Sequence, residues 1–123
     1  MQWKLTEDRP IWLQLTEQLT ERIVSGVYPT GSRMPPVREL AAEAGVNPNT
    51  MQRALAQLEA DGLVATNRTA GRTVTEDNAA VDSVRGKLAN EKMDLYVTGM
   101  ATLGYSEEEA ATLLMERRRK NNG

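Results

Sequence analysis

Two short amphipathic segments joined by a tight turn constrain the fold of this chain more than any other feature. Residues 36–44 and residues 48–61 both carry apolar side chains at helical spacing. Gly45 is suited to end the first helix, Asn47 to cap the second, and Pro48 to occupy the first turn of the second. Two short helices with this turn chemistry are typical of a helix-turn-helix.

The segment before this unit predicts a further helix and an ordered connector. Asp8 is placed to cap a helix with Pro10 in its first turn, and Gly26 is placed to end that helix near Ser25. The apolar face of this helix holds Trp12, Leu15, Leu19 and Ile23. Residues 26–36 contain two Gly and three Pro, which predicts a turn-rich connector.

The segment after the helix-turn-helix predicts a wing and two more helices. Residues 63–66 and residues 72–75 are β-compatible runs around a short loop, so they predict a hairpin. Beyond an acidic boundary, helical spacing returns over residues 81–103. Ser106 and Glu109 then form a capping box that opens a last helix.

The predicted fold is mainly α-helical with a small β-hairpin wing, an N-terminal winged helix-turn-helix followed by two C-terminal dimerisation helices. We predict a DNA-binding domain over residues 1–77 and a two-helix dimerisation region over residues 78–123. The expected dimerisation residues are apolar positions of the last two helices: Leu88, Leu95, Met100, Leu103, Leu113 and Leu114. The alternative is that these apolar faces fold back onto the winged domain.

Composition excludes several classes of function. The 123 residues include no Cys and no His, which removes disulfides, thiolate chemistry, the usual general base and the commonest transition-metal ligand. We therefore expect neither an enzyme nor a metal or cofactor site. The polar N-terminus and the absence of a long apolar run predict a cytoplasmic protein with no membrane partner.

The net charge does not by itself favour binding to nucleic acid. The formal charge is −2 and the sequence pI is about 5.2. Between residues 33 and 72, however, five Arg stand against four acidic residues. Contact with DNA must therefore rely on a few arginines placed on one face.

The second helix of the helix-turn-helix carries the candidates for base contact. Its outward positions are Asn47, Asn49, Thr50, Gln52 and Arg53. Amide side chains are suited to adenine, and Arg is suited to guanine or phosphate. The alternative is an ordinary solvated face on which Asn47 is only a cap. The absence of Lys–Glu pairs on this face favours the DNA interpretation.

Four other arginines are candidates for contact with the DNA backbone or the minor groove. Arg33 and Arg38 lie at the entry of the first of these two helices, where unpaired N–H groups favour anions. An ion pair for Arg38 is disfavoured because the positions three and four residues on are alanines. Arg68 and Arg72 flank the hairpin tip, from which a cation reaches the minor groove. The alternative for both is a charged turn that maintains solubility.

Several spaced runs together resemble the GntR family of bacterial regulators. They are residues 10–15, 26–35, 37–41, 45–50, 53–55, 58–59 and 61–64, within a resemblance that covers residues 10–75. The Val-Asn-Pro-Asn-Thr run and the brief C-terminal region resemble the short YtrA-type subgroup. The resemblance implies DNA contacts at Arg38, Asn47, Asn49, Thr50, Gln52 and the wing near Gly71.

This chain departs from the family pattern at three places in the predicted interface. Pro36 replaces a small capping residue, which removes one phosphate-contacting hydroxyl. Pro48 stands where many members have Arg. The wing tip over residues 68–71 reads Arg-Thr-Ala-Gly instead of Arg-Gly-x-Gly, which predicts a stiffer tip.

These features predict a transcription regulator, a homodimeric repressor that binds an inverted-repeat operator in double-stranded DNA. Members of the YtrA-type subgroup commonly repress operons that encode ATP-binding-type transporters, and the resemblance implies the same here. Any small-molecule effector is expected to bind between subunits or between the winged domain and the C-terminal helices. The alternative is a winged-helix module that binds protein or RNA and no operator.

Overall fold

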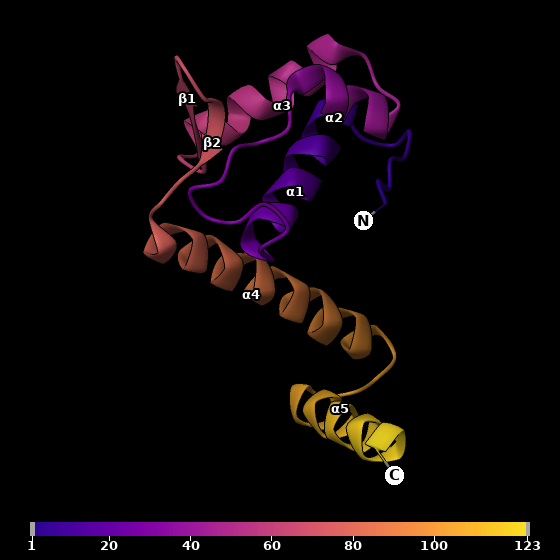
Figure 1. The fold of residues 1–123 in the computed structure, drawn as a ribbon. Helices are drawn as coiled ribbons and strands as arrows, with labels where there is room; N and C mark the ends of the chain where they lie inside the picture. The colour runs from indigo at the N-terminus through magenta and orange to yellow at the C-terminus, as the bar shows by residue number, and fades with distance from the viewer. Residues whose placement is uncertain (1, 123) are drawn as a thin grey trace. The chain divides into compact units, whose positions relative to one another are not determined.

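The computed structural model describes residues 2–122 as five helices and one β-hairpin (Figure 1). In chain order the elements are α1 (Ile11–Val24), α2 (Val37–Ala44), α3 (Pro48–Ala60), β1 (Val64–Asn67), β2 (Gly71–Val74), α4 (Asn78–Thr102) and α5 (Glu107–Asn122). The chain divides into two compact units between Arg85 and Gly86, within α4. Among the helices of residues 2–122, none combines the length and the hydrophobicity that a membrane span requires. The predicted fold class, mainly helical with a hairpin wing, is confirmed.

The core of the first unit lies between α1, α2 and α3. Leu15, Leu19 and Ile23 of α1 are almost completely buried, in agreement with the predicted apolar face. Both α1 and α2 pack on α3. The inward residues of α3 are Met51, Ala54, Leu55 and Leu58, all fully buried. Each buried Leu or Met contributes about 1.5–3 kcal/mol relative to an exposed one, so these faces hold the three helices together.

The turn between α2 and α3 has the predicted chemistry. Gly45 ends α2 in the left-handed conformation, with φ of 71°. The side-chain oxygen of Asn47 accepts a hydrogen bond from the Asn49 amide at 2.7 Å, and Pro48 is the first residue of α3. These three residues fix where the second helix of the helix-turn-helix begins.

The predicted cap of α1 is wrong. The helix begins at Ile11, and the residue in the cap position is Pro10, which has no side chain able to accept a hydrogen bond. Asp8 lies two residues too early and accepts a hydrogen bond from the Thr6 hydroxyl instead. The start of α1 is therefore held by contacts that come from outside the helix.

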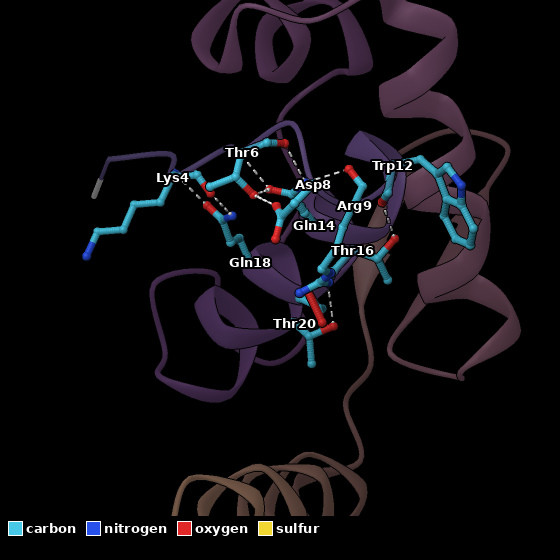
Figure 2. A network of polar contacts seen from close by, with 10 residues as sticks. Lys4, Thr6, Asp8, Arg9, Trp12, Gln14, Thr16, Gln18 and Thr20 are labelled. Atoms are coloured by element: carbon cyan, nitrogen blue, oxygen red, sulfur yellow. Dashed lines mark hydrogen bonds and ion pairs between the residues drawn. The ribbon is translucent and has the colours of Figure 1, made fainter. Parts of the chain in front are cut away.

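Those contacts are made by the N-terminal arm, residues 2–9, which runs beside α1 (Figure 2). The Gln18 amide accepts from the Lys4 N–H at 2.9 Å and donates to the Lys4 carbonyl at 2.7 Å. The Gln14 amide does the same with Thr6, at 2.8 Å each way. Gln14 and Gln18 are four residues apart along a helix, and Thr6 and Lys4 are two residues apart along an extended chain. Both separations are about 6 Å, so the two glutamines can bond to alternate residues of the arm.

A buried arginine connects the arm to α2. Arg22 is 4% exposed, and its guanidinium lies 4.0 Å from the centre of the Trp3 ring. It donates to Tyr28 Oη at 2.8 Å and forms an ion pair with Glu43 at 3.0 Å. The hydrogen bond from Arg22 lowers the pKa of Glu43, and a second from Trp3 acts in the same direction. This cluster joins the arm, the end of α1 and the end of α2.

The wing is an antiparallel hairpin with a three-residue loop. Val64 pairs with Val74, and Asn67 pairs with Gly71. The side-chain oxygen of Asn67 accepts from the amide and the hydroxyl of Thr69, both at 2.9 Å. Gly71 has φ of 74°, a conformation that strains any residue with a Cβ. The hairpin is confirmed, with each strand displaced by one residue from its predicted limits.

The connector between α1 and α2 also pairs with the wing, which the turn-rich composition did not indicate. Arg33 forms an antiparallel bridge with Thr73. The Met34 amide donates to the Arg72 carbonyl at 2.8 Å. The backbone at Arg33 is therefore fixed to the edge of β2 shortly before α2 begins.

The second unit contains most of α4 and all of α5. α4 begins at Asn78, three residues before the predicted start, because the side chain of Asp77 accepts from the Ala80 amide at 3.1 Å. The Ser106–Glu109 capping box is confirmed, with reciprocal bonds of 3.0 and 3.1 Å. Tyr96 Oη donates to the carbonyl of the buried Ala110 at 2.7 Å, which ties α5 to α4.

Candidate nucleic-acid interface

The outward face of α3 is polar and exposed. Asn49, Gln52 and Arg53 are exposed, and Thr50 is half-buried. The opposite face is the buried one, because α1 and α2 pack there. A helix anchored by its apolar face and polar on the other can enter the major groove without disturbing its packing.

Asn47 has a structural role that limits what else it can do. Its side-chain oxygen is occupied by the cap bond to the Asn49 amide. Within residues 2–122 no acceptor is paired with its amide nitrogen, which therefore remains available as a donor. The structure thus shows the cap directly, and a DNA contact by Asn47 stays a prediction.

Arg53 is held by an aromatic ring. Its guanidinium carbon lies 4.2 Å from the centre of the Trp12 ring, and Trp12 is half-buried at the start of α1. No carboxylate of the described chain forms an ion pair with Arg53. The sequence pattern placed Trp12 among the apolar residues of α1, and a spacing of 41 residues gave no sign of this contact.

Arg38 and Arg33 are both exposed near the start of α2. Arg38 lies in the first turn of the helix, and none of the ion pairs in the described residues involves it. Arg33 stands on the edge of the wing through its bridge to Thr73. Two unneutralised guanidinium groups therefore flank the entry of the helix-turn-helix, where they favour phosphate.

The two wing arginines differ in their surroundings. Arg68 is exposed and is the first residue of the three-residue loop that leads to Gly71. Arg72 is paired with Glu59 of α3, with Nε 2.6 Å from the carboxylate oxygen. Glu59 also accepts from the Thr66 hydroxyl at 2.6 Å, and these bonds to Thr66 and Arg72 lower the pKa of Glu59. Arg72 thus ties the wing to α3, and its DNA contact stays a prediction.

Taken together, a capped polar helix, a preceding helix that packs on it and a paired hairpin define a winged helix-turn-helix protein. The chain belongs to the GntR family, because the model of the bacterial regulatory proteins of that family matches residues 12–74. The YtrA-type subgroup inferred from the sequence is confirmed by its similarity to two proteins named YtrA, one from Bacillus subtilis and one of solved structure from Sulfolobus acidocaldarius.

Two curated relatives cover most of the chain. The HTH-type transcriptional regulator YhcF of Bacillus subtilis is 38% identical over 101 residues, which are 82% of this chain and 84% of the relative. The HTH-type transcriptional repressor YtrA of the same organism is 37% identical over 86 residues, 70% of this chain and 65% of the relative. These relatives are transcriptional regulators and not enzymes.

Solved structures show the same fold. A GntR family transcriptional regulator from Listeria monocytogenes has a TM-score of 0.83 and 30% identity, covering 91% of this chain and 98% of that chain. The DNA-binding domain of AraR in complex with operator ORX1 has a TM-score of 0.52 and 26% identity, over 61% of this chain and 92% of that chain. The chain is therefore a DNA-binding transcription regulator of the GntR family.

Proposed function

We propose that a homodimer of this chain represses transcription by binding an inverted-repeat operator, with one α3 in each of two major grooves. The observation that carries the proposal is the outward face of α3, where two exposed amides and an unneutralised arginine stand on a capped helix. The operator complex solved for AraR supports DNA as the partner, and the name of YtrA as a repressor supports repression.

The roles of the side chains follow from their chemistry. Asn49 and Gln52 are proposed to read adenine edges, because an amide can donate and accept in one plane. Arg33, Arg38 and Arg68 are proposed to contact phosphates or the minor groove, which fixes the register of the protein on the duplex.

Dimerisation is proposed to use the C-terminal helices. Leu95 is 74% exposed and Leu103 is 71% exposed, and Leu114 is also exposed, so each chain presents a large apolar surface. Leu88, Met100 and Leu113 of the same two helices are half-buried, and we propose that they extend this surface. A second copy that covers it by two-fold symmetry explains why the operator is expected to be an inverted repeat.

The N-terminal and C-terminal parts of the chain are proposed to have the separate roles expected from the sequence. Residues 1–77 are proposed to bind DNA and residues 78–123 to dimerise. Val81, in the first turn of α4, is buried and lies in the first compact unit. The start of α4 is therefore proposed to belong to the fold of the winged domain.

The regulated genes are proposed to encode a transporter of the ATP-binding type. This part of the proposal rests on the YtrA-type resemblance alone, since the residues that contact DNA do not identify the genes beside the operator. The proposal predicts transporter genes beside this gene and an inverted repeat upstream of it. An inverted repeat that the purified protein does not bind would exclude that site as its operator.

The proposal is tested by binding of the full chain to duplex DNA over a range of salt concentrations. Arg38→Ala should weaken binding to operator and to random-sequence DNA alike, because a phosphate contact carries no sequence information. The slope of log affinity against log salt concentration should become shallower by the contribution of about one phosphate. A loss confined to the operator would contradict the role given to Arg38. Salt-independent binding by the unmodified protein would contradict the proposed function itself.

A further inference from the structure

We propose that Trp12 of α1 is a positioning residue that holds Arg53 for contact with a DNA phosphate. This inference rests on the proposed function, because it concerns how the same surface meets DNA. It assigns a role to a residue outside the helix-turn-helix, at the start of α1.

The first step is the geometry of the contact. The Arg53 guanidinium carbon stands 4.2 Å from the centre of the Trp12 ring, at cation–π distance. A ring that covers one face of a guanidinium leaves the N–H groups at its edge unoccupied. The contact therefore orders Arg53 without removing its charge or its donors.

The second step is the contrast with two other arginines of the winged domain that have side-chain partners. Arg72 is paired with Glu59, which neutralises its charge. Arg22 also stacks on a tryptophan, but it is buried and donates to Glu43 and Tyr28. Arg53 is exposed, and in the described residues it has the ring of Trp12 and no carboxylate. Its environment is that of a group kept ready for an external anion.

The third step is the place of the guanidinium. Trp12 projects from α1 on the side away from Gln14 and Gln18, which hold the N-terminal arm (Figure 2). Because Arg53 lies against Trp12, its charged end is drawn from the outward face of α3 toward its flank on the α1 side. The flanks of a recognition helix meet the walls of the groove, where the phosphates are.

The energetic reason for such a platform is entropic. An arginine loses rotamer freedom when it binds a phosphate, and a side chain already restricted in the free protein loses less. Removing the platform should therefore weaken phosphate binding by an amount typical of an exposed cation–π contact, about two- to five-fold.

The test is a double-mutant cycle on the full chain, with random-sequence duplex DNA as the probe and salt titration as the readout. Arg53→Ala should reduce the affinity for DNA. The slope of log affinity against log salt concentration should become shallower by the contribution of about one phosphate. Trp12→Leu should reduce affinity about two- to five-fold alone and not at all in the Arg53→Ala background. Trp12→Tyr should restore most of the affinity, because its ring still stacks.

The matched control is Trp3→Leu, which removes the other tryptophan–arginine stack. It should lower the thermal unfolding temperature and leave the affinity of the folded protein for DNA unchanged. The positioning role would be overturned if Trp12→Leu reduced the affinity for DNA equally in the unmodified and Arg53→Ala backgrounds. It would also be overturned if Trp12→Leu reduced the affinity in neither background. The absence of duplex binding by the unmodified chain would overturn the proposed function and this inference together, a result distinct from a failed cycle.

Discussion

Arg22 is a buried charge whose partners come from three segments of the chain: Trp3, Tyr28 and Glu43. A buried cation is tolerated only when it is paired and hydrogen-bonded. None of these partners follows from helical periodicity, because Glu43 lies 21 residues away in the sequence. The sequence therefore predicted the apolar core of α1 and missed the ion pair between the buried Arg22 and the half-exposed Glu43.

We predict that Glu43→Gln destabilises the winged domain by about 1–2 kcal/mol at neutral pH, a modest value because the Glu43 side chain is 46% exposed. The pKa of Glu43 is lower in the folded chain than its ordinary value, so its stabilisation is complete above the ordinary carboxyl range and is lost as the pH falls through the lowered pKa. Urea unfolding of both proteins across this pH range should show the two stabilities converging at low pH. A constant difference would contradict the assignment.

A second prediction at this scale concerns base reading. Asn49→Ala or Gln52→Ala should flatten the base preference at one or two operator positions, since a good amide–adenine pair contributes about 1–3 kcal/mol of discrimination. Selection of binding sites from a random duplex library measures this preference. Ala56→Ser, on the same exposed face, is the matched control and should leave the profile unchanged. Unaltered profiles for both amide variants would show that another face reads the bases.

The predicted limits of the secondary structure elements agree with the structure at the caps and helix ends that depend on neighbouring residues. The caps at Asn47 and Ser106 and the end of α2 at Gly45 were predicted because each depends on residues within one turn. The bridge at Arg33 was missed because its partner strand lies 40 residues further on and the connector has no alternating pattern. The ion pair between Arg72 and Glu59 was missed for the same reason, since the two residues are 13 positions apart.

At the scale of the elements, the attachment of the N-terminal arm can be tested one residue at a time. Gln14→Met should speed hydrogen exchange at the Thr6 amide and cost about 1–3 kcal/mol, because it leaves polar groups of the arm unpaired. Gln18→Met should act mainly on the Lys4 amide. Each variant is the control for the other. Equal effects of both variants at both amides would show that the arm detaches as one unit.

For the whole molecule, the proposed dimer is the feature on which operator binding is expected to depend. One winged domain contacts few bases, and two linked domains combine their contacts at high effective concentration. We predict that Leu95→Glu combined with Leu114→Glu converts the proposed dimer to a monomer and weakens operator binding without unfolding the winged domain. Both side chains are exposed in the single chain, so the change should not disturb its own packing. Sedimentation and circular dichroism measure the two effects.

The control for this prediction is Thr98→Glu, which adds a charge to an exposed polar position of α4. A chain that ends at Arg85 provides a second comparison, because it retains the buried Val81 and lacks the exposed leucines. It should be folded and monomeric. A dimer formed by this shortened chain, or a monomer formed by the full chain, would contradict the assigned interface.

The pairing of the arm with α1 also sets how the two segments can change in evolution. The side-chain amides of Gln14 and Gln18 form hydrogen bonds with the backbone N–H and carbonyl groups of Thr6 and Lys4. Every residue type except proline has both of these backbone groups. Positions 4 and 6 are therefore expected to vary widely among relatives that keep this arm, with proline excluded. Positions 14 and 18 should instead retain an amide, and loss of one glutamine should be accompanied by loss of the other.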